Sequence, residues 1–178
     1  SIKNMLLDAE NLKVIGSDVS ARIRKLTGIT GRTFDIRDLS TYFSYSPTQI
    51  QLQELDLLTN VSSVNADIIL NYEYGDFSDF NNKVLWDASF RNSNLSTSDL
   101  AKFYNEFGYG ERLQFNGDLD GTLNQFTLQN VDLKGFKNSE IKANKLFFYN
   151  MMDREQDFIL EGNFTKLQTQ YSDLANLL

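Results

Sequence analysis

The chain has 178 residues, of which 41% are hydrophobic and 23% are charged, values typical of a folded protein and not of a disordered one. It contains no cysteine and no histidine, which excludes disulfide frameworks, Cys/His zinc sites and catalysis by either side chain. The net charge of -7 argues against a nucleic-acid partner.

One basic cluster, Arg22 to Lys25, stands out near the start of the chain. Arg22 and Arg24 alternate with Ala21 and Ile23, which predicts that the two arginines lie on the solvent-facing side of a strand, here called its wet face. A phosphate-binding site is the alternative interpretation of the same four residues.

Alternation of apolar and polar residues predicts most of the fold. In chain order it runs through 64–74, 84–91, 113–123 and 158–165. Strands with this period have one apolar and one wet face, as in antiparallel sheets, whereas buried parallel strands are apolar on both. The 14 Phe, 8 Tyr and single Trp also favour strands. We therefore predict an all-β fold built from an antiparallel sheet.

Three short helices are expected near residues 38–43, 97–107 and 172–178. Each segment contains Asp-Leu, then two small or polar residues, then two large apolar residues. The middle segment has the clearest boundaries, because Ser96 can cap its start and Gly108 can end it.

An internal repeat of 74–77 residues is indicated by matching segments in the same order. Leu52–Leu57 matches 128–133, and 62–66 matches 139–143. In both copies of the first segment the apolar residues switch from even-numbered to odd-numbered positions, a change of parity. This predicts a bulge or tight turn. We treat residues 1–178 as one section of about two repeats without an internal domain boundary. Because it starts at the tail of one unit, we expect an interior section of a longer protein.

The motif Gly117-Asp118-Leu119-Asp120-Gly121-Thr122-Leu123, followed by the strands 126–133 and 139–143, resembles the TamB-like members of the AsmA-like superfamily. The resemblance extends over most of residues 10–178. It implies an antiparallel repeat sheet folded into a U-shaped apolar trough, a β-taco. It also implies a periplasmic protein of the cell envelope, anchored in the inner membrane through a segment outside this chain.

The resemblance further implies lipid transport, in which the groove carries phospholipid acyl chains between the inner and outer membranes. The partners would be a phospholipid or another acyl-chain lipid and, through other parts of the protein, an outer-membrane assembly barrel. No catalytic group, metal or cofactor is expected, and the chain is not expected to be an enzyme. The predicted groove lining shares one parity in each strand: Val64, Ile68, Leu70, Tyr72, Trp86, Phe90, Leu113, Phe115, Leu119, Phe126, Leu128, Ile141, Phe158, Leu160 and Phe164.

Other interpretations stay open. A TamB-like trough could serve as an assembly factor in outer membrane biogenesis, pairing its edge with strands of client proteins. A carbohydrate-active β-sandwich or β-helix is a third possibility. Asp118 and Asp120 could form a metal pair or face water around an inward Leu119, and the acidic segment 76–82 could bind calcium or be a solvated loop. Trp86 fits a groove or core anchor better than a sugar platform.

Overall fold

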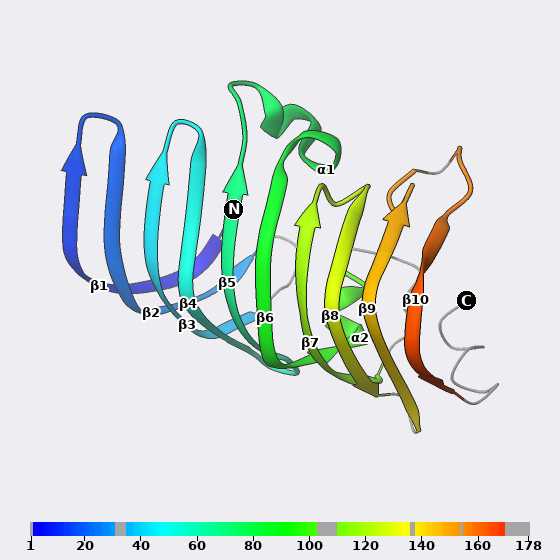
Figure 1. The fold of residues 1–178 in the computed structure, drawn as a ribbon. Helices are drawn as coiled ribbons and strands as arrows, with labels where there is room; N and C mark the ends of the chain where they lie inside the picture. The colour runs from blue at the N-terminus through cyan, green and yellow to red at the C-terminus, as the bar shows by residue number, and fades with distance from the viewer. Residues whose placement is uncertain (1, 31–34, 103–109, 136–137, 154, 170–178) are drawn as a thin grey trace.

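The computed structural model describes residues 2–30, 35–102, 110–135, 138–153 and 155–169, and of these the side chains of 2–4 and 30 are not described. These residues form a single ten-stranded sheet (Figure 1). The strands are β1 (Ile2–Ile15), β2 (Asp18–Thr30), β3 (Asp35–Ser46), β4 (Gln49–Thr59), β5 (Ser63–Asn71), β6 (Leu85–Ser96), β7 (Arg112–Gly121), β8 (Phe126–Gly135), β9 (Ser139–Tyr149) and β10 (Ile159–Gln168).

Each strand pairs antiparallel with the next one along the chain, so that the order in space is the order in sequence. The prediction of an all-β antiparallel fold is therefore confirmed. The sheet is open: its first and last strands do not meet, and it is not strongly curled (Figure 1). Such a meander needs only short connections between neighbouring strands.

The helix expected at 38–43 was a wrong prediction, because these residues lie inside β3. The Asp-Leu motif has helical spacing, but the segment also alternates, with Thr41 buried and Tyr42 exposed. Pairing with β2 and β4 stabilises the alternating pattern, which outweighs the weak helical preference of six residues.

The helix expected at 97–107 is present as the short α2 (Thr97–Leu100), whose N-cap Ser96 accepts a hydrogen bond from the Ser98 amide. The rest of that segment from 103 onward and the helix expected at 172–178 lie outside the described residues. Two further short helices, η1 (Asp76–Asp79) and α1 (Phe80–Lys83), were not predicted. They form the connection between β5 and β6.

Bulges interrupt the long strands at matching places. Glu54 in β4, Asn92 in β6 and Asn130 in β8 all have a positive φ, and they are evenly spaced along the chain. The pairing register shifts beside each of them. The parity change predicted for the segments 52–57 and 128–133 is thereby confirmed as a bulge. Bulges bend a strand, and the strands bend towards their lower ends in Figure 1.

Candidate functional site: the apolar face of the sheet

One face of the sheet is apolar from the first strand to the last. The register joins apolar side chains of neighbouring strands into rows that cross the sheet. One row contains Val19, Tyr45, Ile50, Leu70, Trp86, Phe126, Phe148 and Leu160, with Gly121 between Trp86 and Phe126. The next row contains Ala21, Phe43, Leu52, Ile68, Ala88, Leu119, Leu128 and Leu146. We call this surface the apolar face.

The predicted lining residues lie on the apolar face but differ in burial. Ile68, Tyr72, Leu113 and Phe115 are buried. Val64, Leu70, Trp86, Phe90, Leu119 and Leu128 are half-buried and pack against two core clusters, one centred on β4 to β6 and one on β7 to β9. Phe126 and Ile141 are also half-buried, whereas Phe158, Leu160 and Phe164 are exposed.

Sequence reasoning missed the part of the apolar face that β1 to β4 contribute. Val19, Ala21 and Ile23 alternate with polar residues, so the signal was present in the sequence. The polar half of that pattern contains the two basic residues Arg22 and Arg24. The structure extends the apolar face across these strands to Val14 of β1.

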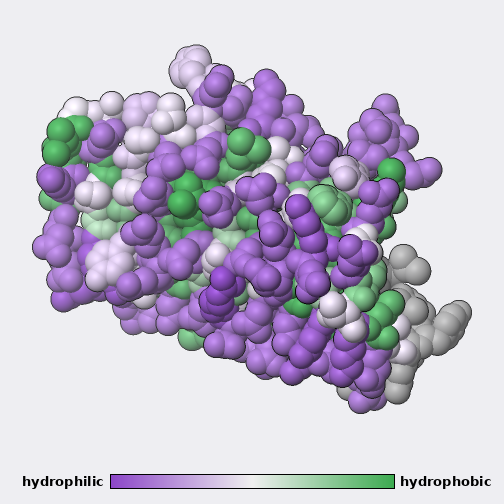
Figure 2. Space-filling model, in the orientation of Figure 1, coloured by the Kyte–Doolittle hydropathy of each residue, from purple (hydrophilic) through white to green (hydrophobic). Residues whose placement is uncertain are grey.

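The apolar face has no second sheet over it in the described part of the chain, and much of it reaches solvent at the two edges. The solvent-accessible area is 11041 Å², against about 8,800 Å² expected for a compact monomer of this mass. Figure 2 shows hydrophobic side chains reaching the surface in several patches among hydrophilic ones. Exposed apolar surface is typical of a face that contacts a ligand or partner, which makes the apolar face the candidate site.

Aromatic rings cover one end of the apolar face. Phe77 of η1 contacts Tyr72 edge-on, with ring centroids 4.6 Å apart, and Phe80 of α1 contacts Trp86 at 6.0 Å. Burial raises the pKa of the Tyr72 hydroxyl. The indole Nε1 of Trp86 is buried without a hydrogen-bond partner. Trp86 therefore acts as an apolar anchor beneath the connection between β5 and β6.

Gly121 allows this row of large side chains to continue across β7. Its φ is +128°, and a Cβ placed there would lie 2.5 Å from the backbone oxygen of Gln125. Gly121 lies opposite Trp86 on one side and Phe126 on the other. The glycine of the sequence motif is thus required by close packing and by backbone conformation.

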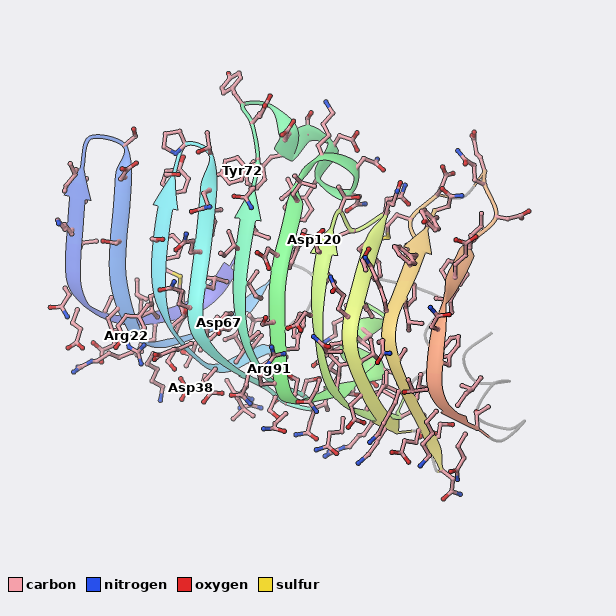
Figure 3. The ribbon with its side chains drawn as sticks, in the orientation of Figure 1. Arg22, Asp38, Asp67, Tyr72, Arg91 and Asp120 are labelled. Atoms are coloured by element: carbon pink, nitrogen blue, oxygen red, sulfur yellow. The ribbon has the colours of Figure 1, made fainter. Side chains whose placement is uncertain are left out.

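The opposite face carries a polar network along the bulges. Arg91 and Asp118 form an ion pair at 2.7 Å, and Asn130 donates a hydrogen bond to Asp118 at 2.8 Å. The hydrogen bond from Asn130, followed by those from Arg91 and Ser89, lowers the pKa of Asp118. In Figure 3, Arg91 lies with Arg22, Asp38 and Asp67 along the lower part of the sheet, below Tyr72 and Asp120.

The basic cluster near the start of the chain lies on the same face of the sheet. Arg24 forms ion pairs with Asp8 at 2.9 Å and with Glu10 at 3.3 Å. Arg22 lies 3.8 Å from the ring centroid of Tyr42. These basic side chains occupy the wet face of β2, as predicted. Arg24 forms ion pairs with acids of β1, and Arg22 packs on an aromatic ring of β3.

A second polar cluster surrounds Asp99 of α2, which is buried. Thr59 donates a hydrogen bond to it at 2.6 Å and Lys102 does so at 2.8 Å. Burial alone would raise the pKa of Asp99, but the hydrogen bonds from Lys102, Thr59 and Ser62 outweigh it and lower the pKa. The cluster ties α2 to the turn between β4 and β5 and has a structural role.

The other candidate sites of the sequence give no comparable arrangement. Asp118 and Asp120 lie on the wet face with Leu119 packed on the apolar side, and the acids of 76–82 bond to neighbouring residues within their own loop. No group of acidic side chains in the described ranges is placed to hold a metal ion.

Two shallow depressions of about 290 and 270 Å³ over β1 to β4 include none of the fifteen predicted lining residues. No helix among the described residues is long and apolar enough to cross a membrane.

Comparisons of the chain with protein-family models, with curated proteins and with solved structures gave no match. The functional argument therefore starts from the geometry of the apolar face.

Proposed function

We propose that the chain is a section of a periplasm-spanning hydrophobic groove that carries phospholipid acyl chains between the inner and outer membranes. The observation that supports it most is the continuity of the apolar rows across the ten strands, with no second sheet over them in the part of the chain that the structure describes. In this proposal the bends at the bulges shape the sheet into a U-shaped trough, with the apolar face inside.

Acyl chains suit the apolar face because they need apolar contact area and few specific polar contacts. Burial of apolar surface contributes about 25 cal/mol per Å², so a chain can be held by area alone. Neighbouring positions along a row offer similar side chains, so a bound chain can move from one to the next without crossing a polar barrier. The network around Asp118 lies on the other face and does not interrupt this path.

The proposed setting follows from the same resemblance that suggested the function. The groove belongs to a protein anchored in the inner membrane outside this chain, and an outer-membrane assembly barrel is engaged through other parts of that protein. The proposed role is non-enzymatic and needs no cofactor. Trp86 and the rings over it would then close one side of the groove near β5 and β6.

The proposal is tested by a matched pair of substitutions in β10. Leu160 and Ile159 are neighbours with 43% and 44% exposure, and they lie on opposite faces of the strand. Leu160→Arg places a charge on the apolar face, where an acyl chain cannot pair with it, whereas Ile159→Arg places the same charge on the other face.

We expect Leu160→Arg to lower the amount of phospholipid that co-purifies with the protein, measured by native mass spectrometry, by about tenfold, since an acyl chain lying over this position would bury the charge without a partner. Ile159→Arg should leave it unchanged. Circular dichroism and thermal unfolding check that both variants are folded. Equal lipid loss in both variants, or no lipid on the wild-type protein, would contradict the proposal.

A second function, an assembly factor for outer-membrane proteins, is favoured by a different observation. The outer edges of β1 and β10 are unpaired within the described residues. A strand of a client protein could add to either edge by main-chain hydrogen bonds. This function predicts capture of nascent outer-membrane strands at the edges and does not require lipid on the apolar face.

A further inference from the structure

Residues 73–83, which connect the upper ends of β5 and β6 in Figure 1, place two aromatic rings over the apolar face. Phe77 lies edge-on to Tyr72. Phe80 lies edge-on to Trp86. The two rings occupy the place that an acyl chain would need if it moved along the row through Trp86. This row is therefore covered at β5 and β6.

The connection makes little buried contact with the sheet. None of residues 73–83 is buried, whereas Tyr72 and Val84 at its two ends are. In the described part of the chain its hydrogen bonds run within the connection or to the adjoining Val84. The exception is the backbone amide of Asn124, which donates to the carbonyl oxygen of Asn81 at 2.9 Å. Segments with few buried groups open locally while the rest of the fold stays intact.

A buried donor beneath the connection destabilises the closed arrangement. The indole Nε1 of Trp86 is buried and has no hydrogen-bond partner, which costs free energy in the state that buries it. When the connection moves away, water or the ester carbonyl of a lipid can accept from Nε1. Gly75 provides a position for the movement, because its φ is +95° and a Cβ built there would meet no other atom within 4 Å.

We propose that residues 73–83 form a lid over an acyl-chain site on the apolar face. An entering acyl chain displaces the rings of Phe77 and Phe80. It then packs on Tyr72 and Trp86 in their place, so that apolar surface stays covered in both states. The inference rests on the proposed function and adds where the lipid enters and what it displaces. A lid of this kind controls how fast a ligand reaches its site.

A removable bridge tests whether the lid opens, because the chain has no cysteine of its own. Asn81→Cys and Asn124→Cys are combined in one protein and joined by a short thiosulfonate cross-linker, which a reductant removes. The bridge ties the lid to the turn between β7 and β8. The control joins Ser63→Cys to Asn94→Cys, because these residues pair at the other ends of β5 and β6.

Hydrogen exchange measures the opening without any lipid. The amide of the buried Val84 donates to the carbonyl oxygen of Phe80 in the lid, so its exchange requires the lid to open. We expect the lid bridge to slow exchange at Val84 by about tenfold and the control bridge to leave it unchanged. Equal exchange in bridged and reduced protein would overturn the lid, whatever the lipid measurements give.

Lipid uptake is measured separately, from vesicles of phosphatidylethanolamine and phosphatidylglycerol that contain a phospholipid with a pyrene-labelled acyl chain. Energy transfer from Trp86, the single tryptophan, reports the arrival of the label. The lid bridge should slow uptake by about tenfold, reduction should restore it, and the control bridge should have no effect. Equally fast uptake in bridged and reduced protein would overturn the lid and leave the proposed function standing. No uptake by any form, with normal exchange at Val84, would contradict the proposed function and the acyl-chain site with it.

Removal of one ring tests the lid in the opposite direction. Phe80→Ala deletes the ring over Trp86 and should speed both lipid uptake and exchange at Val84 by about tenfold. Tyr74→Ala is the matched control, because Tyr74 is a fully exposed aromatic residue of the same connection. Equal rates in wild type and both variants would overturn the proposed lid.

Discussion

At the scale of single residues, the bulges are stabilised by side chains from the next strand. The backbone amides of Glu54 and Asn92 donate hydrogen bonds of 2.7 Å to the side chains of Asp67 and Asn116, respectively. A bulge leaves backbone groups without ladder partners, and such groups need another partner. Asn is also among the residues that adopt a positive φ at least cost.

Asp67→Ala should therefore lower the free energy of unfolding by about 1 kcal/mol, the usual net value of one such hydrogen bond. Asp87→Ala is the matched control, because Asp87 is an exposed acid on the same face. Urea denaturation measures both, and the control should stay within about 0.5 kcal/mol of wild type. Equal losses in the two variants would show that Asp67 does not cap the bulge.

Acid should destabilise the protein through Asp118 and Asp99, whose pKa values are lowered in the folded state. Their contribution to stability is fully present above the unfolded pKa of about 4 and is lost as the pH falls through the lowered folded pKa. Thermal unfolding as a function of pH should show a steeper loss below this point for wild type than for Asp118→Asn. The same slope in both proteins would contradict the assignment, and Asp87→Asn provides the control.

At the scale of elements, alternation and parity predicted more of the fold than motifs did. The parity change in 52–57 and 128–133 located two of the bulges correctly. The bulge at Asn92 was missed, because Ser93 and Asn94 replace the apolar residue and the acid that mark the other copies. The helix expected at 38–43 failed since these residues pair with β4, and residues 41–43 also with β2, which stabilises the extended backbone.

The bulge in β6 should tolerate glycine and reject a branched side chain. Asn92 has a φ of 48°, a region that β-branched residues avoid at a cost of about 1 to 3 kcal/mol. We expect Asn92→Val to lower the free energy of unfolding by that amount and Asn92→Gly to change it by less than about 0.5 kcal/mol. Chemical denaturation of the two variants makes the comparison, and similar losses in both would show that the positive φ is not the cause.

At the scale of the whole molecule, the described residues form a single sheet, and none of them forms a second sheet over its apolar face. Alternation predicts that a strand has one apolar face, but it does not determine whether a second sheet covers it, because both arrangements need the same pattern. The residues assigned to the lining that lie inside strands fall on one side of the pairing register. Their burial ranges from Phe115 in a core cluster to the exposed Leu160 at the edge. These differences in burial depend on how side chains of neighbouring strands pack. The spacing of apolar residues along the sequence does not determine that packing.

The most direct test of the central claim compares neighbouring positions on the two faces. Photoreactive side chains are placed at Leu119 and Leu128 on the apolar face, and at Asp120 and Thr127, their neighbours in β7 and β8 on the wet face. The protein is illuminated in cells that produce it, and bound phospholipid is identified by mass spectrometry. The proposal predicts phospholipid adducts at Leu119 and Leu128 and none above background at Asp120 and Thr127. Equal adducts at all four positions, or none at Leu119 and Leu128 in folded protein, would contradict it.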